Sequence, residues 1–353
     1  MRVVVFLISL FFLAQLISCT EGYLKSSKIY VTGKVGEILV VCDDDLWDSQ
    51  IRPVLDSGLT RFILPYFPDV TTFELKHRSK KTFSGPIKRH RNILFIDVNS
   101  KYKARDGSVR YQEDVWANGQ TVVRIKSKDK DELLRVFKVN MDDIHRQFDF
   151  RSWSRIRKYF SEQQDQAINK KIANNFKIHI DLPNGSRIVS KRNNFFRIEL
   201  PDASRPIEFV GSGQQDVGTI FSGVMIYQYP YKDSSQFNFT NLMRARDTML
   251  RYNVPHETLG LYMGTQYNEF VFPEYSRDVN FNGSLNGIEI RGMFVFKGRY
   301  RHATGGAFWS FHFMHPKTKK TVCISGYVDA PSTTSWTHAL REIQAVWKSV
   351  KLL

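Results

Sequence analysis

The stretch Gly36-Glu37-Ile38-Leu39-Val40-Val41-Cys42-Asp43-Asp44-Asp45-Leu46-Trp47 predicts a buried strand that leads directly into a helix. Four consecutive apolar residues over 38–41 are typical of a strand that is covered on both faces. Beyond the aspartates, apolar residues recur at helical spacing, at Trp47, Ile51, Val54 and Leu55. Gly58 would end this helix, and Pro53 indicates a kink or two short pieces.

Two further strands and a helix follow in the same region. Residues 92–98 and 120–125 are apolar runs typical of buried strands. After Ser127 an amphipathic helix is predicted, with its apolar face at Leu133, Leu134, Phe137, Met141, Ile144 and Phe148. The order strand, helix, strands, helix predicts a small N-terminal α/β domain over residues 34–150, and the basic stretch 151–175 is predicted to be a helix that connects it to a second domain.

The remainder, residues 176–353, is richer in strands. The alternating run 176–182 followed by Pro183-Asn184-Gly185 predicts a hairpin. Further strands are predicted at 195–200, 224–229, 287–296, 307–314 and 321–329, and helices at 241–252 and 335–350. The predicted fold class is α+β, with two α/β sandwich domains built on mostly antiparallel sheets that are flanked by helices.

Composition agrees with a folded two-domain protein. The chain has 353 residues, with 51 Lys and Arg against 35 Asp and Glu, which gives a net charge of +16. Its 42% hydrophobic and 24% charged residues exclude a mainly disordered, collagenous or coiled-coil chain. Three cysteines are too few for a disulfide scaffold, and Cys42 and Cys323 are expected to be buried free thiols in different domains.

The N-terminus indicates export. Arg2 precedes an apolar stretch, Val3 to Ala14, and Leu16-Ile17-Ser18-Cys19 follows. This pattern resembles the bacterial lipobox, which implies a signal peptide at 1–18, a lipidated Cys19 and a tether over 19–33. Such a protein is anchored by acyl chains, palmitate among them, in the cell envelope, and we expect the outer membrane facing the periplasm. An ordinary signal peptide with an incidental Cys19, or an uncleaved anchor helix, remains the alternative.

Several segments together resemble the domain of unknown function 4837 family of bacterial envelope lipoproteins. They are Gly36 to Val41 with Asp45-Leu46-Trp47, His90 to Leu94, Trp116-Ala117 with 120–125, 227–231, 288–293 and 305–308. The basic stretch 297–302 departs from the family pattern. The resemblance implies lipidation and an envelope location, but no activity. The closing helix that ends Trp347-Lys348-Ser349-Val350 is similar to the PsbP-like sandwich, which concerns the fold alone.

Asp43, Asp44 and Asp45 form the densest acidic cluster, at the end of the first strand. Three carboxylates could hold Mg²⁺ or Ca²⁺, but they lack the spacing of a calcium loop. Capping of the following helix, with Asp45 as the cap, is the favoured interpretation, and no metal or other cofactor is expected.

Basic residues gather in the stretch from Lys76 to Arg91, which is predicted to be a loop. The seven cations are Lys76, Arg78, Lys80, Lys81, Lys88, Arg89 and Arg91. An exported protein rarely meets nucleic acid, so an anionic membrane surface or another envelope component is the expected partner. A solvated basic loop with no partner is the alternative, and the sequence does not identify a protein partner.

The sequence carries no recognised catalytic signature. It lacks a His-Glu-x-x-His motif, a nucleophile elbow and a phosphate-binding loop. We therefore expect a membrane-anchored, non-enzymatic binding or scaffolding protein. The alternative is a hydrolase or lyase that acts on cell-envelope material through an acid/base pair of an unfamiliar kind.

Overall fold

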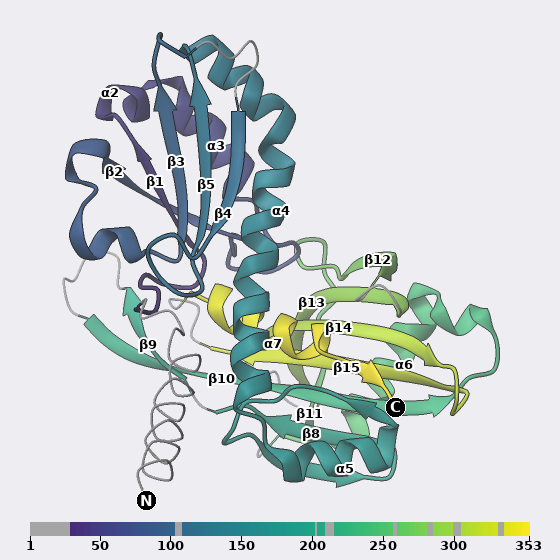
Figure 1. Cartoon of the computed structure of the whole chain (residues 1–353). Helices are drawn as coiled ribbons and strands as arrows, with labels where there is room; N and C mark the ends of the chain where they lie inside the picture. Colours follow the sequence, from purple (N-terminus) through teal and green to yellow (C-terminus); the bar gives the residue numbers. More distant parts are fainter. Residues whose placement is uncertain are drawn as a thin grey trace, which may run out of the picture.

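The computed structural model describes residues 29–102, 108–201, 203–208, 215–256, 260–280, 285–298, 305–330 and 335–353. The predicted signal peptide, Cys19 and most of the predicted tether lie outside these residues. Within the described residues the chain forms a five-stranded sheet near the N-terminus and a nine-stranded sheet toward the C-terminus. The long helix α4 (Lys130–Glu162) runs from the first sheet to the second (Figure 1).

The N-terminal sheet has the order β2-β1-β3-β5-β4. Its strands are β1 (Glu37–Cys42), β2 (Glu74–Ser79), β3 (Asn92–Val98), β4 (Ser108–Glu113) and β5 (Thr121–Ser127). β1 pairs in parallel with β2 and β3, β3 pairs in parallel with β5, and only β4 is antiparallel to its neighbour among the described strands. The α+β class with two domains is confirmed, but this sheet is mainly parallel, because each of these crossovers passes over a face of the sheet before the next strand.

The helical stretch after β1 is divided, as Pro53 indicated. It consists of α2 (Asp44–Leu46), a wider turn η1 (Trp47–Ile51) and α3 (Arg52–Leu59), with Ser49 in a non-helical conformation. Leu46, Ile51, Leu55 and Leu59 pack with α4 on one face of the sheet. Proline is tolerated because it occupies the first turn of α3, where its missing N–H has no partner to lose.

The stretch predicted to be a basic loop has regular structure. It begins in β2 and continues through two short 3₁₀ helices, η2 (Lys80–Thr82) and η3 (Gly85–Arg89). The sequence does not show β2, because it carries Glu74, Lys76 and Arg78 on its exposed side and only Leu75 as an apolar residue. β2 forms at the edge of the sheet because β1 supplies the complete row of backbone partners.

The predicted connecting helix is the second half of α4. This helix is continuous across residue 150 and is followed by α5 (Gln166–Phe176). Asp129 caps the start of α4 by accepting the N–H of Glu132 at 2.8 Å. The helix contacts both regions: Leu133, Phe137, Ile144 and Phe148 pack on the first sheet, and Phe160 belongs to the core of the second.

The C-terminal sheet is antiparallel, as predicted. Its main path is β11-β13-β14-β15-β10-β8-β7, with β12 beside β13 and β9 beside β10. The bounds are β7 (Arg187–Arg192), β8 (Phe195–Glu199), β9 (Ala203–Glu208), β10 (Gln215–Pro230), β11 (Leu261–Thr265), β12 (Glu274–Asn280), β13 (Asn286–Gly298), β14 (Gly305–His315) and β15 (Lys320–Asp329). The expected strands at 195–200, 224–229, 287–296, 307–314 and 321–329 all lie within or beside these ranges.

The hairpin predicted around Pro183-Asn184-Gly185 is wrong. β6 (Ile178–His179) pairs with the terminal strand β16 (Lys351–Leu352), and β7 pairs with β8 instead. Phe176, Ile178, Ile180 and Leu182 are all fully buried in the core under the last helix. From Ile178 onward the segment crosses the core as an extended chain, paired only briefly, with β16 at residues 178–179 and with Gln164 at Pro183.

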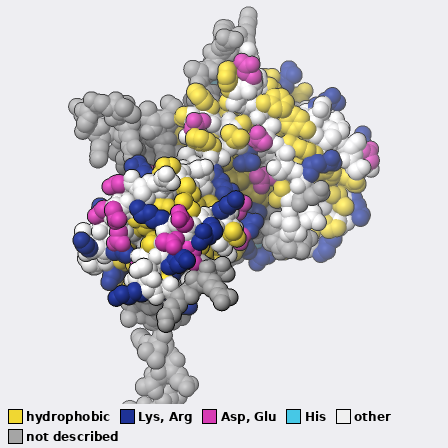
Figure 2. All heavy atoms as spheres, turned by 90° about the horizontal axis from the view of Figure 1, so that it is seen from above, with side chains coloured by type: hydrophobic (Ala, Val, Ile, Leu, Met, Phe, Trp, Pro, Cys, Tyr) yellow, Lys and Arg dark blue, Asp and Glu magenta, His cyan; other side chains and the backbone are white. Residues whose placement is uncertain are grey.

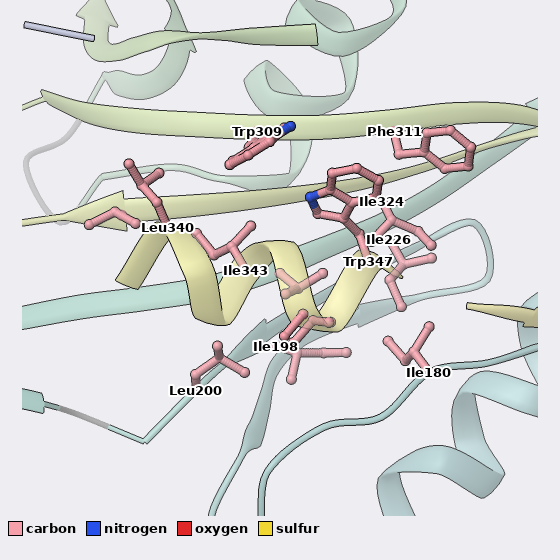
Figure 3. Close-up of a cluster of buried hydrophobic side chains, with 14 of the residues drawn as sticks. Ile180, Ile198, Leu200, Ile226, Trp309, Phe311, Ile324, Leu340, Ile343 and Trp347 are labelled. Atoms are coloured by element: carbon pink, nitrogen blue, oxygen red, sulfur yellow. The ribbon is translucent and has the colours of Figure 1, made fainter. Parts of the chain in front are cut away.

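Helices cover both faces of the C-terminal sheet. On one face lies α7 (Thr337–Lys348), whose Trp347 faces Phe311, with ring centroids 5.6 Å apart, and approaches Trp309 (Figure 3). On the other face lies α6 (Phe239–Asn253), which follows the short helix η4 (Ser234–Phe237). Arg341 of α7 pairs with Asp149 of α4, and Thr337 donates to the Thr71 carbonyl at 3.0 Å, so α7 also joins the two regions.

Candidate functional site

An open pocket of about 460 Å³ lies at the β2 edge of the N-terminal sheet. β1 and β2 form its floor, with Leu39 beside Lys76 and Val41 beside Arg78. The chain over η3 folds back across this face, and Ile87 packs on the small cluster that contains Leu39 and Val41. The lining combines cations, imidazoles, one carboxylate and apolar groups, from Thr32, Glu37, Leu39, Lys76, His77, Arg78, Pro86, Ile87 and His90.

Glu37 and His90 meet inside this pocket. His90 Nε2 lies 3.5 Å from Glu37 Oε2, and His90 Nδ1 lies 3.0 Å from the Asn92 carbonyl oxygen. Glu37 Oε2 also accepts the backbone N–H of Lys34 at 2.8 Å. Gly33 has a φ of +88°, and a Cβ there would fall 2.5 Å from His90 Nε2, so only glycine allows the ring to sit against this turn.

Burial lowers the pKa of His90, and this effect outweighs the Asn92 carbonyl and the Glu37 carboxylate, which both favour the charged ring. The imidazole is therefore mainly neutral at pH 7. An anionic ligand in the pocket would favour the protonated form of His90, because its negative charge stabilises the imidazolium. In that form both ring nitrogens are donors, Nδ1 toward the Asn92 carbonyl and Nε2 toward Glu37.

The seven predicted cations divide into two groups. Lys76 pairs with Glu74, Lys80 contacts Asp43 at 2.6 Å and Asp97 at 3.0 Å, and Arg91 Nε donates to the Gly33 carbonyl at 2.9 Å. These three side chains are engaged within the fold. The other four are Arg78, Lys81, Lys88 and Arg89. Within the described residues none of these four forms an ion pair, and Arg78 and Lys81 are exposed.

The three aspartates do not converge. Asp43 occupies the N-cap position of α2 without a side-chain capping bond, and its carboxylate pairs with Lys80 instead. Asp44 lies 3.9 Å from His77, and Asp45 is exposed within α2. The predicted capping by Asp45 is therefore wrong, because the helix begins two residues earlier. Over the described residues, no group of three or more His, Cys, Asp or Glu side chains could hold a metal ion.

The sequence model of a family described as "Domain of unknown function (DUF4837)" matches residues 165–349, just over half of the chain. The chain belongs to the DUF4837 family. A second model, described as "Domain of unknown function (DUF8532)", matches residues 31–175. The family expected from the sequence is confirmed, and its extent is the C-terminal half. The N-terminal segments that resembled it, and the pocket, lie in the DUF8532 match.

No curated protein matches the chain. The structure described as "Solution Structure of Cyanobacterial PsbP (CyanoP) from Synechocystis sp. PCC 6803" is similar over 48% of this chain and 92% of its own, at 6% sequence identity and a TM-score of 0.24. This likeness concerns the fold alone, as the sequence expectation did, and it supports no functional comparison.

In this DUF4837 protein the two described cysteines are buried and free, as expected. Burial raises the pKa of the Cys42 thiol and of the Cys323 thiol to about 12, so both are protonated at neutral pH and neither is an activated nucleophile. No helix in the described part of the chain is long and apolar enough to cross a membrane.

Sequence reasoning missed the pocket, although it identified several residues around it. Lys76 and Arg78 were recognised only as members of a basic run, and Glu37 only as part of a strand. The available signal was the alternation Glu74, Lys76, Arg78, which places all three side chains on one side of a strand. The parallel register with β1 brings this side over Leu39, and no local pattern encodes that register.

Proposed function

We propose that this protein is a lipid-anchored, non-enzymatic binding protein of the bacterial cell envelope, tethered through Cys19. Its N-terminal domain would recognise anionic groups, on lipid or on another envelope component, through the basic pocket and the cations around it. The observation that carries the proposal is a set of four cations that form no ion pair among the described residues, Arg78, Lys81, Lys88 and Arg89; Arg78 lines the pocket, and the other three lie in the segment that includes its lining residues Pro86, Ile87 and His90.

The energetics support binding to an anionic surface. Each Lys or Arg close to such a surface contributes about 1 kcal/mol, and the effect fades within a Debye length. On the face seen in Figure 2, Lys and Arg side chains are interspersed with acidic ones. Recognition would therefore depend on the local cluster at the pocket and less on the net charge of +16.

Vesicle binding tests this proposal. A chain that begins at Thr20, and so lacks the predicted lipid, is expected to bind anionic vesicles better than neutral ones and to lose the preference at high salt. Changing Arg78, Lys81, Lys88 and Arg89 together to Glu should abolish the preference. Lys80 is left unchanged, because its two carboxylate partners make it part of the fold.

The matched control reverses four exposed cations on α4 and α5, namely Arg135, Lys138, Lys170 and Lys171. It changes the net charge by the same amount and should keep most of the preference. Equal loss in both variants would show that net charge alone drives binding, and equal binding of the wild-type chain to both vesicle types would contradict the proposal.

One observation favours the alternative, a hydrolase or lyase that acts on envelope material. Glu37 and His90 form an acid/base pair in an open pocket, and a neutral imidazole beside a carboxylate can accept a proton from a bound substrate. The test is release of soluble fragments from isolated envelope material by the wild-type protein, with Glu37→Gln and His90→Gln as inactive controls. Equal release by all three proteins would exclude this pair as the catalytic centre.

A further inference from the structure

The face of the C-terminal sheet beneath α6 is unusually polar for a buried surface. Tyr227 of β10, Cys323 of β15 and His312 of β14 stand side by side in one row, because the register pairs Tyr227 with Cys323 and His312 with Cys323. Ser325 and Ser310 occupy the next row on the same face. All of these side chains are buried. A sheet face that packs against a helix ordinarily carries apolar residues here.

Arg246 of α6 lies over this face and is fully buried. Its Nη1 donates to Thr265 Oγ1 at 2.8 Å, and its guanidinium carbon lies 3.7 Å from the centre of the Phe308 ring. Its Nε and Nη2 have no hydrogen-bond partner among the described residues. One hydrogen bond and one aromatic contact leave most of the five guanidinium donors unused.

The nearest carboxylate compensates this charge poorly. Asp247 Oδ1 lies 4.0 Å from Arg246 Nη1. The same carboxylate accepts the Thr265 N–H at 2.9 Å and the Tyr267 hydroxyl at 3.0 Å, and its side chain is partly exposed. Within the described residues no second acidic side chain pairs with Arg246. A buried cation without close compensation destabilises the folded state.

The groups opposite Arg246 are also short of partners. The Tyr227 hydroxyl has the Cys323 sulfur beside it but no oxygen or nitrogen partner in the described parts of the chain, and His312 Nδ1 has none either. His312 Nε2 lies 3.0 Å from Ser310 Oγ and 3.6 Å from Cys323 Sγ. Ser310 Oγ donates to the Ile290 carbonyl at 3.2 Å, so the neutral His312 ring donates from Nε2 to Ser310 Oγ, and its Nδ1 is an acceptor. Tyr227 and Arg246 thus each present a buried donor group that is not satisfied by oxygen or nitrogen among the described residues.

We propose that the layer between α6 and the β10–β15–β14 face binds a small inorganic anion, held by Arg246 Nε and Nη2 with the Tyr227 hydroxyl as a further donor. The anion supplies the charge that Asp247 does not and satisfies donors that the chain leaves unpaired. Neutral Cys323 and Tyr227 leave Arg246 as the source of net charge on this face, so a cation is excluded on electrostatic grounds.

Bromide, which replaces chloride and scatters anomalously, tests the site directly on the wild-type protein. Crystals grown in sodium bromide should show an anomalous peak within hydrogen-bonding distance of Arg246 Nε or Nη2. An ordered water without anomalous signal at that position would overturn the proposal, since the donors would then be satisfied by solvent.

Thermal unfolding provides the second measurement. At constant ionic strength, chloride in place of gluconate should raise the melting temperature saturably, because a ligand that binds only the folded state stabilises it. Tyr227→Phe removes one donor and should weaken the apparent affinity at least about tenfold. Arg244→Met, an exposed change on the same helix, should leave the response unchanged. Equal melting in both salts, or equal responses of wild type and Tyr227→Phe, would contradict the site.

Discussion

The two sheets of this protein differ in how completely their faces are covered. The N-terminal sheet buries one face under α3 and α4, but its other face carries only a small cluster around Leu39, Val41 and Phe83 and is open at β2. The C-terminal sheet is covered on both faces, by α7 and by α6. In the first region charged groups reach solvent, and in the second polar groups are enclosed.

This difference separates two kinds of recognition. An open, partly apolar face with exposed cations can meet a surface or a large ligand without any change of the fold. Polar groups between a helix and a sheet can meet only a small partner, and they must find it to avoid the cost of unpaired burial.

Truncating a large side chain should cost more in the C-terminal core than on the open N-terminal face. Trp347→Ala removes a fully buried ring between α7 and the sheet and should cost about 4 kcal/mol. Phe83→Ala affects the small cluster and should cost about 2 kcal/mol. Urea unfolding of both variants measures the two losses. Equal losses would show that the two faces are packed alike.

The junction between the regions should be sensitive to a single charge. Asp149→Ala leaves the buried guanidinium of Arg341 without its carboxylate and should cost about 3 kcal/mol. The double variant Asp149→Leu/Arg341→Met removes both charges and should regain most of that loss. Chemical denaturation checks both proteins, and a loss below about 1 kcal/mol in the single variant would mean that solvent compensates Arg341.

The protein should lose stability in acid because His312, on the sheet face beneath α6, is buried in its neutral form. Burial, with a smaller contribution from Arg246, lowers the pKa of His312 to about 3. Between that pH and about 6.5 the unfolded chain binds a proton that the folded chain does not, so stability is lost as the pH falls. From pH 7 to pH 5 this loss is about 2 kcal/mol. His312→Gln should flatten the curve by that amount, and an unchanged slope would contradict the assignment.

The smallest effect distinguishes two neighbouring lysines on the open side. Lys80→Met breaks contacts with Asp43 and Asp97 and should cost about 1 kcal/mol. Lys81→Met alters an exposed side chain without an ion pair in the described residues and should change stability by less than about 0.5 kcal/mol. Thermal unfolding of the two variants in parallel makes the comparison. A larger loss of stability in Lys81→Met than in Lys80→Met would contradict the assignment of Lys80 to the cations that stabilise the fold.

The strands that the sequence predicted are those whose own residues require burial. β1, β3 and β5 are apolar runs, β14 carries aromatic residues on both faces, and β15 is buried along nearly its whole length. Among the strands that it missed, β2 and β4 are polar edges whose stability comes from pairing with a neighbour. The pocket and the polar row beneath α6 depend on register between distant strands, and register is a tertiary property.

Dependence on distant partners also explains two local errors, the cap at Asp45 and the hairpin at residues 183–185. The place of Asp45 before an apolar periodicity predicts a cap, but Asp43 occupies the N-cap position and its side chain pairs with Lys80, a residue 37 positions later. Local propensity at residues 183–185 predicts a hairpin, but the preceding strand β6 pairs with β16 near the C-terminus. In both cases a distant partner determined the local structure.

Hydrogen exchange on the full chain in the presence of anionic vesicles tests the central claim most directly, namely that the open basic face of the N-terminal domain is the binding surface. The account predicts slower exchange over β2, η2 and η3, residues 74–89, and unchanged exchange over α6 and α7. Slower exchange confined to the C-terminal domain, or unchanged exchange over residues 74–89, would contradict it.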